Sequence, residues 1–226
     1  AQNWELVQHQ LAGYDLAAAE GGRVLALTLP DTFRLRLNFT SGFILDILHG
    51  WDSLMALPVH EKLRQLRDPA ARAEWNRLAQ STEGATRSIA NWGGYRILET
   101  FSSQWKPYEG RIIGEVALQL GREPWDVLCD LVIADDLRTV IANQDRGQDD
   151  ATWKRRVEVW RDHRAIVGAS DAGAHLDMID SFSYSTTLLA RAVREHQLLP
   201  LEEAVHLGTG APAELYGLHE RVRVAA

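Results

Sequence analysis

The chain has 226 residues, of which 46% are hydrophobic and 24% charged, as is ordinary for a globular protein. Its formal charge of −7, from 31 acidic and 24 basic residues, argues against a general nucleic-acid binder, which needs a basic face. The single cysteine, Cys129, excludes an intramolecular disulfide and a cysteine metal cluster, and its apolar setting "VLCDLVI" predicts a core residue.

The sequence predicts neither a membrane span nor a secretory leader. No apolar run approaches the roughly 20 residues that a membrane-spanning helix needs. The opening "AQNWELVQHQ" has no initiator methionine and no apolar segment of a signal peptide. We therefore expect a cytoplasmic protein without a membrane partner, and we expect further residues before Ala1 in the gene product.

The first 30 residues have the pattern of a β/α unit. Apolar residues recur at helical spacing over 4–20, and the glycines at 21 and 22 are typical of a helix end. The segment "RVLALTLP" at 23–30 then predicts a short buried strand that Pro30 closes. Helix, glycine turn and strand together form half of a β/α unit.

Residues 31–164 predict a long, mostly helical insertion. Asp68 and Pro69 mark the start of the second of two short helices within 57–80. Further elements are expected in the following order: a strand at 95–101, two helices within 111–136, a loop at 143–153 and a helix at 152–163. The charges of that last helix, "KRRVEVWRDHR", predict a solvated face.

The β/α pattern returns at residue 165. "AIV" at 165–167 predicts a strand, and an apolar stripe over 180–196 predicts a helix. Two more helical segments within 199–218 are interrupted near Gly210 and Pro212. We therefore expect residues 1–226 to form one partial barrel, with barrel units at 1–30 and 165–226 and the insertion at 31–164, because so few strands cannot close a barrel.

The stretch "VGASDAGAHLDMID" at 167–180 places ionisable residues directly after a strand. The carboxyl ends of parallel strands line the active sites of α/β folds, and the small neighbours of Asp171 permit a close approach of substrate or metal. An aspartate there can bind a divalent metal or take a proton from water. Alternatively, the stretch is a polar turn in which Asp177 and Asp180 cap the following helix. His175 could serve as a metal ligand, as a hydrogen-bond donor to a substrate or as a structural residue.

The C-terminal third resembles a known enzyme family. "GASDAGAHLDMID", followed by "YSTTLLARAVREHQLLPLEEAVHLGTGAPAELYGL", is similar to the end of the metal-dependent amidohydrolases, and most of all to the N-acyl-D-amino-acid deacylases. Weaker similarity in "LPVHEKLRQLRDPAARAEW" and "EGRIIGEVALQLGREPWDVLCDL" extends the resemblance over most of the chain.

The resemblance implies an α/β fold, namely the C-terminal part of a (β/α)8 amidohydrolase barrel with one or two zinc ions in the complete enzyme. Asp171 would bind zinc and act as the general base that activates water, and His175 would support substrate binding. Arg96 and Tyr95, together with Trp92 in "NWGGYR", are candidates to hold a substrate carboxylate or acyl group, although all three also suit the core or surface of the insertion.

The chain departs from the family in its metal ligands. The family binds zinc through a His-x-His motif, a bridging residue and two further histidines, whereas the eight histidines here include no His-x-His pair. A catalytic zinc site needs about three protein ligands. We therefore expect the chain alone to bind no catalytic zinc and to show no turnover, with the remaining ligands supplied by a complementing N-terminal half or a second chain.

Two alternatives remain open from the sequence. The chain would serve as an inactive interaction or assembly module, because open sheet edges and a tryptophan-rich insertion favour self-association into a homo-oligomer. In the second alternative, the chain belongs to a cyclic amidohydrolase of the hydantoinase or dihydropyrimidinase type. The deacylase resemblance favours a small N-acyl amino acid as substrate and implies a hydrolase of non-peptide C–N bonds.

Overall fold

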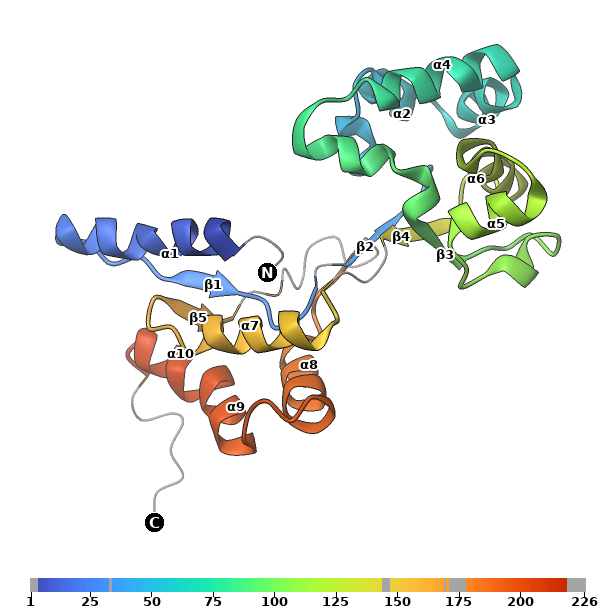
Figure 1. The fold of residues 1–226 in the computed structure, drawn as a ribbon. Helices are drawn as coiled ribbons and strands as arrows, with labels where there is room; N and C mark the ends of the chain where they lie inside the picture. Colours follow the sequence, from blue (N-terminus) through green and yellow to red (C-terminus); the bar gives the residue numbers. More distant parts are fainter. Residues whose placement is uncertain (1–3, 33, 144–146, 169, 171–177, 219–226) are drawn as a thin grey trace. The chain divides into compact units, whose positions relative to one another are not determined.

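A computed structural model describes residues 4–32, 34–143, 147–168, 170 and 178–218, and the fold is mixed α/β (Figure 1), as the sequence predicts. The chain divides into two compact units. Unit 1 comprises Ala1–Arg34 and Asp145–Ala226, and unit 2 comprises Leu35–Gln144. The helical insertion expected at 31–164 therefore overlaps unit 2, whereas the helix near 152–163 falls in unit 1.

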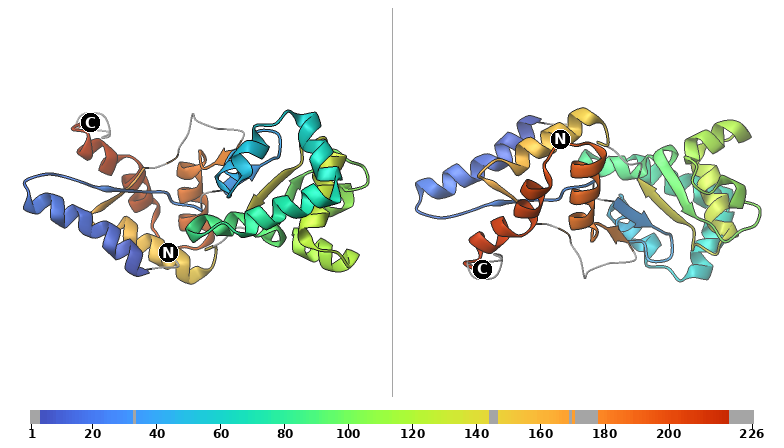
Figure 2. Two further views of the ribbon diagram at one scale, coloured as in Figure 1. Left: turned by 90° about the horizontal axis from the view of Figure 1, so that it is seen from above. Right: turned by 90° about the horizontal axis from the view of Figure 1, so that it is seen from below.

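Unit 1 begins with α1 (Trp4–Ala19) and β1 (Ala26–Thr28), which lie side by side (Figure 2). Gly21 has a φ of +75°, a conformation that glycine adopts without strain. The next amide, of Gly22, donates to the carbonyl oxygen of Ala17 at 2.8 Å and closes the end of the helix. The glycine pair thus stops the helix where the sequence predicts.

The second part of unit 1 pairs with the first through a parallel strand. β5 (Ala165–Val167) pairs with β1 in the register Ala26↔Ala165, Leu27↔Ile166 and Thr28↔Val167. A parallel pair needs a crossover connection, and here the connection contains the whole of unit 2 and helix α7 (Asp150–Trp160). The elements after β5 are β6 (Ile179–Asp180), α8 (Tyr184–Thr187), the π-helical η5 (Leu188–Glu195), α9 (Leu201–Gly208) and α10 (Gly210–Leu215).

Helices cover one face of the β1–β5 pair. Val167 is buried in a cluster drawn from α7, η5 and α9, which comprises Trp153, Val157, Trp160, Leu188, Ala192, Leu199, Ala204 and Leu207. Successive side chains of a strand point to opposite faces, so Ile166 and its partner Leu27 point away from this cluster. Leu27 is 59% exposed. The second face of the pair is therefore open at Leu27 in the described structure.

Unit 2 combines helices with an antiparallel sheet. Its strands are β2 (Arg34–Leu37), β3 (Tyr95–Glu99) and β4 (Val140–Asn143), and β4 pairs antiparallel with both of the others. Its α-helices are α2 (Trp51–Met55), α3 (Val59–Arg67), α4 (Pro69–Gln80), α5 (Ile113–Leu120) and α6 (Pro124–Ala134). Short 3₁₀ segments are η1 (Leu45–Ile47), η2 (Gly84–Ala90), η3 (Trp92–Gly94) and η4 (Lys106–Tyr108). The expected helices and the strand at 95–101 are confirmed, whereas β4 falls partly within the segment predicted as loop.

An aromatic cluster forms the centre of unit 2. Trp51 is fully buried, and its ring centroid lies 5.3–5.9 Å from those of Phe39, Trp75, Trp92 and Trp125. Its indole N–H donates to the carbonyl oxygen of Trp75 at 3.0 Å. A tryptophan ring buries a large apolar area while its N–H can still donate a hydrogen bond, which is why tryptophan can fill a core of this kind. Cys129 is buried in α6, as predicted, and burial raises the pKa of its thiol.

None of the helices in the described part of the chain combines the length and the apolar character that crossing a bilayer requires.

We predict that Trp51→Ala lowers the free energy of unfolding of unit 2 by about 3–5 kcal/mol, because the change leaves a cavity among four rings and removes the indole bond to the carbonyl oxygen of Trp75. Urea denaturation followed by circular dichroism measures the change. Leu118→Ala is the control, because Leu118 is 84% exposed on α5 and its truncation should alter stability by less than about 0.5 kcal/mol. A loss of similar size in both variants would contradict the assignment of Trp51 to the core centre.

A second prediction concerns the turn between α7 and β5. The carboxylate of Asp162 accepts bonds from the backbone N–H of Arg164 at 2.9 Å and from its guanidinium at 2.7 and 2.9 Å. These bonds lower the pKa of Asp162 to about 2. The carbonyl oxygen of Arg164 in turn accepts the N–H of Ala26 at 2.9 Å, so the turn leads directly into the β1–β5 pair.

Because the folded pKa of Asp162 lies below the ordinary 3.8, its stabilising contribution is present above pH 4 and is lost as the pH falls toward 2. After allowance for solvent screening, Asp162→Asn should cost about 1 kcal/mol at pH 7. The difference from the wild type should shrink below pH 4, as thermal unfolding at several pH values will measure. Glu158→Gln, at an exposed position of α7, should show no such difference.

Candidate functional site

The sequence-predicted site begins where the parallel pair ends. The N–H of Gly168 donates to the carbonyl oxygen of Thr28 at 3.2 Å, which extends the pairing one residue beyond β5. The carbonyl oxygen of Ser170 accepts a hydrogen bond from the hydroxyl of Ser181. Residues 170 and 181 are therefore neighbours in the structure. The predicted base Asp171 and its companion His175 lie outside the described residues.

The two other predicted site residues lie in unit 2. Tyr95 is 2% exposed, and its hydroxyl donates to the carbonyl oxygen of Ile89 at 2.8 Å. Burial raises the pKa of this phenol well above its ordinary value. The next residue on β3, Arg96, donates to the carbonyl oxygen of Gly110. Tyr95 is therefore part of the core, and Arg96 joins β3 to the loop that precedes α5.

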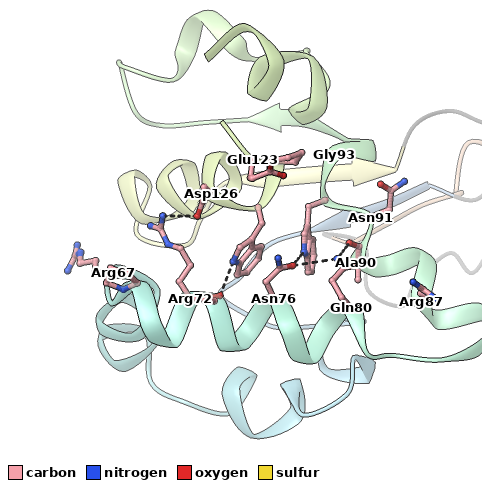
Figure 3. A pocket seen from close by; sticks show the side chains of 15 residues that line it. Arg67, Arg72, Asn76, Gln80, Arg87, Ala90, Asn91, Gly93, Glu123 and Asp126 are labelled. Atoms are coloured by element: carbon pink, nitrogen blue, oxygen red, sulfur yellow. Dashed lines mark hydrogen bonds and ion pairs between the residues drawn. The ribbon is translucent and has the colours of Figure 1, made fainter. Parts of the chain in front are cut away.

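A polar groove of about 850 Å³ lies on unit 2 between α4 and the start of α6 (Figure 3). Arg72, Asn76 and Gln80 follow one another at intervals of four residues and point from α4 toward the opposite wall. This spacing places them on one face of a helix. The spacing of these residues in the sequence was thus a signal for this polar face.

The groove is built on hydrogen-bonded tryptophans. Trp92 donates its indole N–H to the Asn76 side chain at 2.8 Å, and Trp125 donates to the carbonyl oxygen of Arg72 at 2.9 Å. Both rings are almost wholly buried. Trp92, which its position in "NWGGYR" made a candidate for substrate contact, is therefore an almost wholly buried, hydrogen-bonded residue of the groove lining.

The charges of the groove are partly paired. Arg72 forms ion pairs with Asp126 at 3.4 Å and with Asp130 at 2.7 Å. Burial lowers the pKa of Arg72, but the nearby carboxylates raise it, and the net effect is a raised pKa. Arg67 and Arg87 also line the groove and are exposed, with no ion pair to any described residue. The groove can therefore attract anionic or polar ligands. The side chains of Arg72, Asn76 and Gln80, however, already form hydrogen bonds within the protein.

A second cavity, of about 410 Å³, lies within unit 1. Its walls come from α1, from β1 with the residues that follow it, and from α7. Arg156 of α7 lies in its wall and is half-buried, which differs from the solvated face predicted for this helix. Ligands of parallel α/β proteins bind near the carboxyl ends of strands, and Leu29, Asp31 and Thr32 of this cavity directly follow β1.

Metal ligands do not gather in the described part of the chain. No group of three or more histidine, cysteine, aspartate or glutamate residues there is placed to hold a metal ion. The described residues thus do not by themselves fit the catalytic zinc that the family resemblance implies.

No family model matches the chain, and no curated protein or solved structure is significantly similar to it.

We predict that Tyr95→Phe lowers the free energy of unfolding by about 1–2 kcal/mol, because it leaves the carbonyl of Ile89 buried without its donor. Tyr108→Phe is the matched control, since the Tyr108 hydroxyl makes no hydrogen bond with any described residue. Urea denaturation measures both. An unchanged stability for Tyr95→Phe would show that the hydroxyl is free for another role, such as the substrate contact expected from the sequence.

Proposed function

We propose that the chain is the C-terminal part of a zinc-dependent amidohydrolase barrel that hydrolyses the amide C–N bond of N-acyl-D-amino acids or similar small substrates. The observation that carries this proposal is that β5, in the parallel β1–β5 pair, ends at Val167, shortly before the "SDAGAH" stretch in the sequence. In barrels and open parallel sheets, this end of a strand is where catalytic residues lie.

The order of elements also supports the proposal. α1, β1, an insertion, α7, β5 and the helices after residue 183 form two successive β/α units with a folded unit inserted between them. Large insertions in β/α barrels follow the strands, as unit 2 does here. Leu27 is exposed on the second face of the strand pair. In a complete barrel, this face would point into the interior, and the other strands would cover it.

Asp171 has the central chemical role in the proposal. Hydrolysis adds water across the amide bond: the water oxygen attacks the acyl carbon, and the nitrogen leaves as an amine. The carboxylate of Asp171 takes the proton of the attacking water and delivers it to the leaving nitrogen, so proton and charge balance over the reaction. His175 orients the substrate at the same strand end.

The zinc ligands of the proposed enzyme are supplied largely from outside the described residues. One carboxylate cannot hold a catalytic zinc ion, which needs about three protein ligands. We therefore propose that the chain works together with a complementing polypeptide segment or a second chain that carries these ligands.

The exposed apolar surface of unit 1 favours an assembly role as the second candidate function. Among the residues of unit 1 that the structure describes, ten large apolar ones are exposed, namely Leu6, Leu16, Val24, Leu27, Phe182, Leu189, Leu201, Val205, Tyr216 and Leu218. Apolar surface and unpaired strand edges of this kind favour association with another polypeptide. In this candidate, the chain binds its partner without catalysing a reaction.

We predict that Asp171→Asn lowers kcat for N-acetyl-D-amino acids by about 10²- to 10⁴-fold in the native polypeptide that contains residues 1–226, because the amide cannot accept the proton. Asp177→Asn is the matched control in the same stretch and should keep activity within about threefold. Amine release measures the rate, and circular dichroism verifies the fold.

For the isolated 1–226 chain, we expect neither turnover nor a tight zinc site in an equilibrium titration. A stoichiometric, tightly bound zinc ion in that chain would contradict the proposal that the ligands come from elsewhere. Full activity of Asp171→Asn would reject Asp171 as the general base, whereas no amine release by the native polypeptide itself would reject the enzymatic role and leave the assembly role.

A further inference from the structure

The cavity of unit 1 has one charged wall and an otherwise mixed lining. Apolar side chains from α1, from β1 and the residue that follows it, and from α7 form much of the rest, namely Val7, Leu11, Leu27, Leu29 and Val159. Its volume of about 410 Å³ falls within the range of pockets that hold small organic ligands. The guanidinium of Arg156 is the cation in this wall.

Neutral groups hold this guanidinium in place. Its Nη2 donates to the hydroxyl of Thr32 at 3.1 Å, and its central carbon lies 4.5 Å from the centre of the Trp153 ring. The Thr32 hydroxyl also accepts a bond from Gln148 at 2.9 Å. The Nη1 atom of Arg156 is buried and has no hydrogen-bond partner among the described residues.

Arg156 differs in this respect from the neighbouring arginines of unit 1. Arg161 pairs with Glu203 at 2.6 Å, Arg164 with Asp162 at 2.7 Å, and Arg191 with Glu195 at 3.2 Å. Arg156 forms no ion pair with a described carboxylate. Buried arginines are ordinarily paired, because an unpaired buried charge is costly.

Nearby charges only partly offset the charge of Arg156. Asp31 lies in the same cavity wall, but its Oδ1 already accepts bonds from the N–H of Thr32 at 2.7 Å and from Gln148 at 3.1 Å. Arg191, on the same Trp153 ring at 5.1 Å, adds a repelling positive charge. Burial, together with this repulsion, lowers the pKa of Arg156 despite the attraction of Asp31 and Asp149. An anion in the cavity would therefore meet an under-compensated cation.

We propose that this cavity binds a small monocarboxylic acid with an apolar chain, the carboxylate pairing with the guanidinium of Arg156 and the chain lying against the aliphatic wall. Arginine and carboxylate match in charge and planar geometry. The leucine and valine side chains accommodate a hydrocarbon chain, and the described lining offers no second cation for a second anionic group. The proposal concerns binding alone and is independent of the role of Asp171.

Isothermal titration calorimetry of the 1–226 chain with hexanoate tests the proposal. Hexanoate should bind the wild type with a measurable affinity, and Arg156→Met should weaken binding by about 10- to 100-fold, because a charge-assisted pair is lost. Arg155→Met is the matched control: it makes the same chemical change at an exposed position of α7 outside the cavity lining and should leave the affinity within about twofold. Hexanamide and acetate test the charge and the chain separately.

Hexanamide, which lacks the charge, and acetate, which lacks the hydrocarbon chain, should each bind the wild type at least about tenfold more weakly than hexanoate. Thermal unfolding without ligand supplies a second readout. Arg156→Met should be at least as stable as the wild type, because an apolar side chain of similar length replaces an unpaired buried cation. Equal hexanoate affinity in Arg156→Met, acetate binding as tight as hexanoate, or no hexanoate binding to the wild type would each overturn the proposal.

Discussion

The parallel hydrogen bonding between β1 and β5 is the constraint on which unit 1 depends. The two strands are separated in sequence by all of unit 2 and α7, yet they align residue for residue from Ala26 and Ala165 onward. A parallel pair requires a crossover, and α7 returns the chain over the helical face, where Trp153 and Trp160 pack on Val167. Because both strands run in the same direction, the segments that follow them, at 29–32 and from 168, leave the pair at the same end. The Arg156 cavity owes its position to this arrangement, since its lining includes β1 and the residues that follow it.

Unit 2 is held together by a different kind of interaction. Four tryptophans of its aromatic core donate their indole N–H within the unit: Trp51 to Trp75, Trp75 to Gln65, Trp92 to Asn76 and Trp125 to the backbone of Arg72. These bonds join α2, α4 and α6 to the segment before β3, and the polar groove is the outer surface of the same packing. An insertion with its own buried core can fold on its own contacts, so its presence between β1 and β5 need not disturb their pairing.

Local sequence signals predicted the elements best where one residue type has one strong structural use. Gly21 and Gly22 end α1, and Asp68 caps α4 by accepting the N–H of Ala70 at 2.9 Å. The antiparallel pairing of β2 with β4 had no such signal, because "RLRL" and "VIAN" are short and acquire their meaning only from a partner far away in sequence. Arg156 was predicted on a solvated face, because a charged helix gives no indication that a neighbouring helix and strand will enclose one of its arginines.

The sequence by itself determined the mixed α/β class, most helices, the strand at 165–167 and a motif that resembles the amidohydrolases. These features follow from hydrophobic periodicity, capping residues and a short sequence motif, each of which involves only residues that are close together in the sequence. Only the tertiary structure decided that β1 and β5 are partners, that Tyr95 is a core residue and that Arg156 borders a cavity without a described carboxylate partner. The physical reason is that burial and charge compensation depend on residues that packing brings together from distant parts of the chain, and no local pattern records which residues those are.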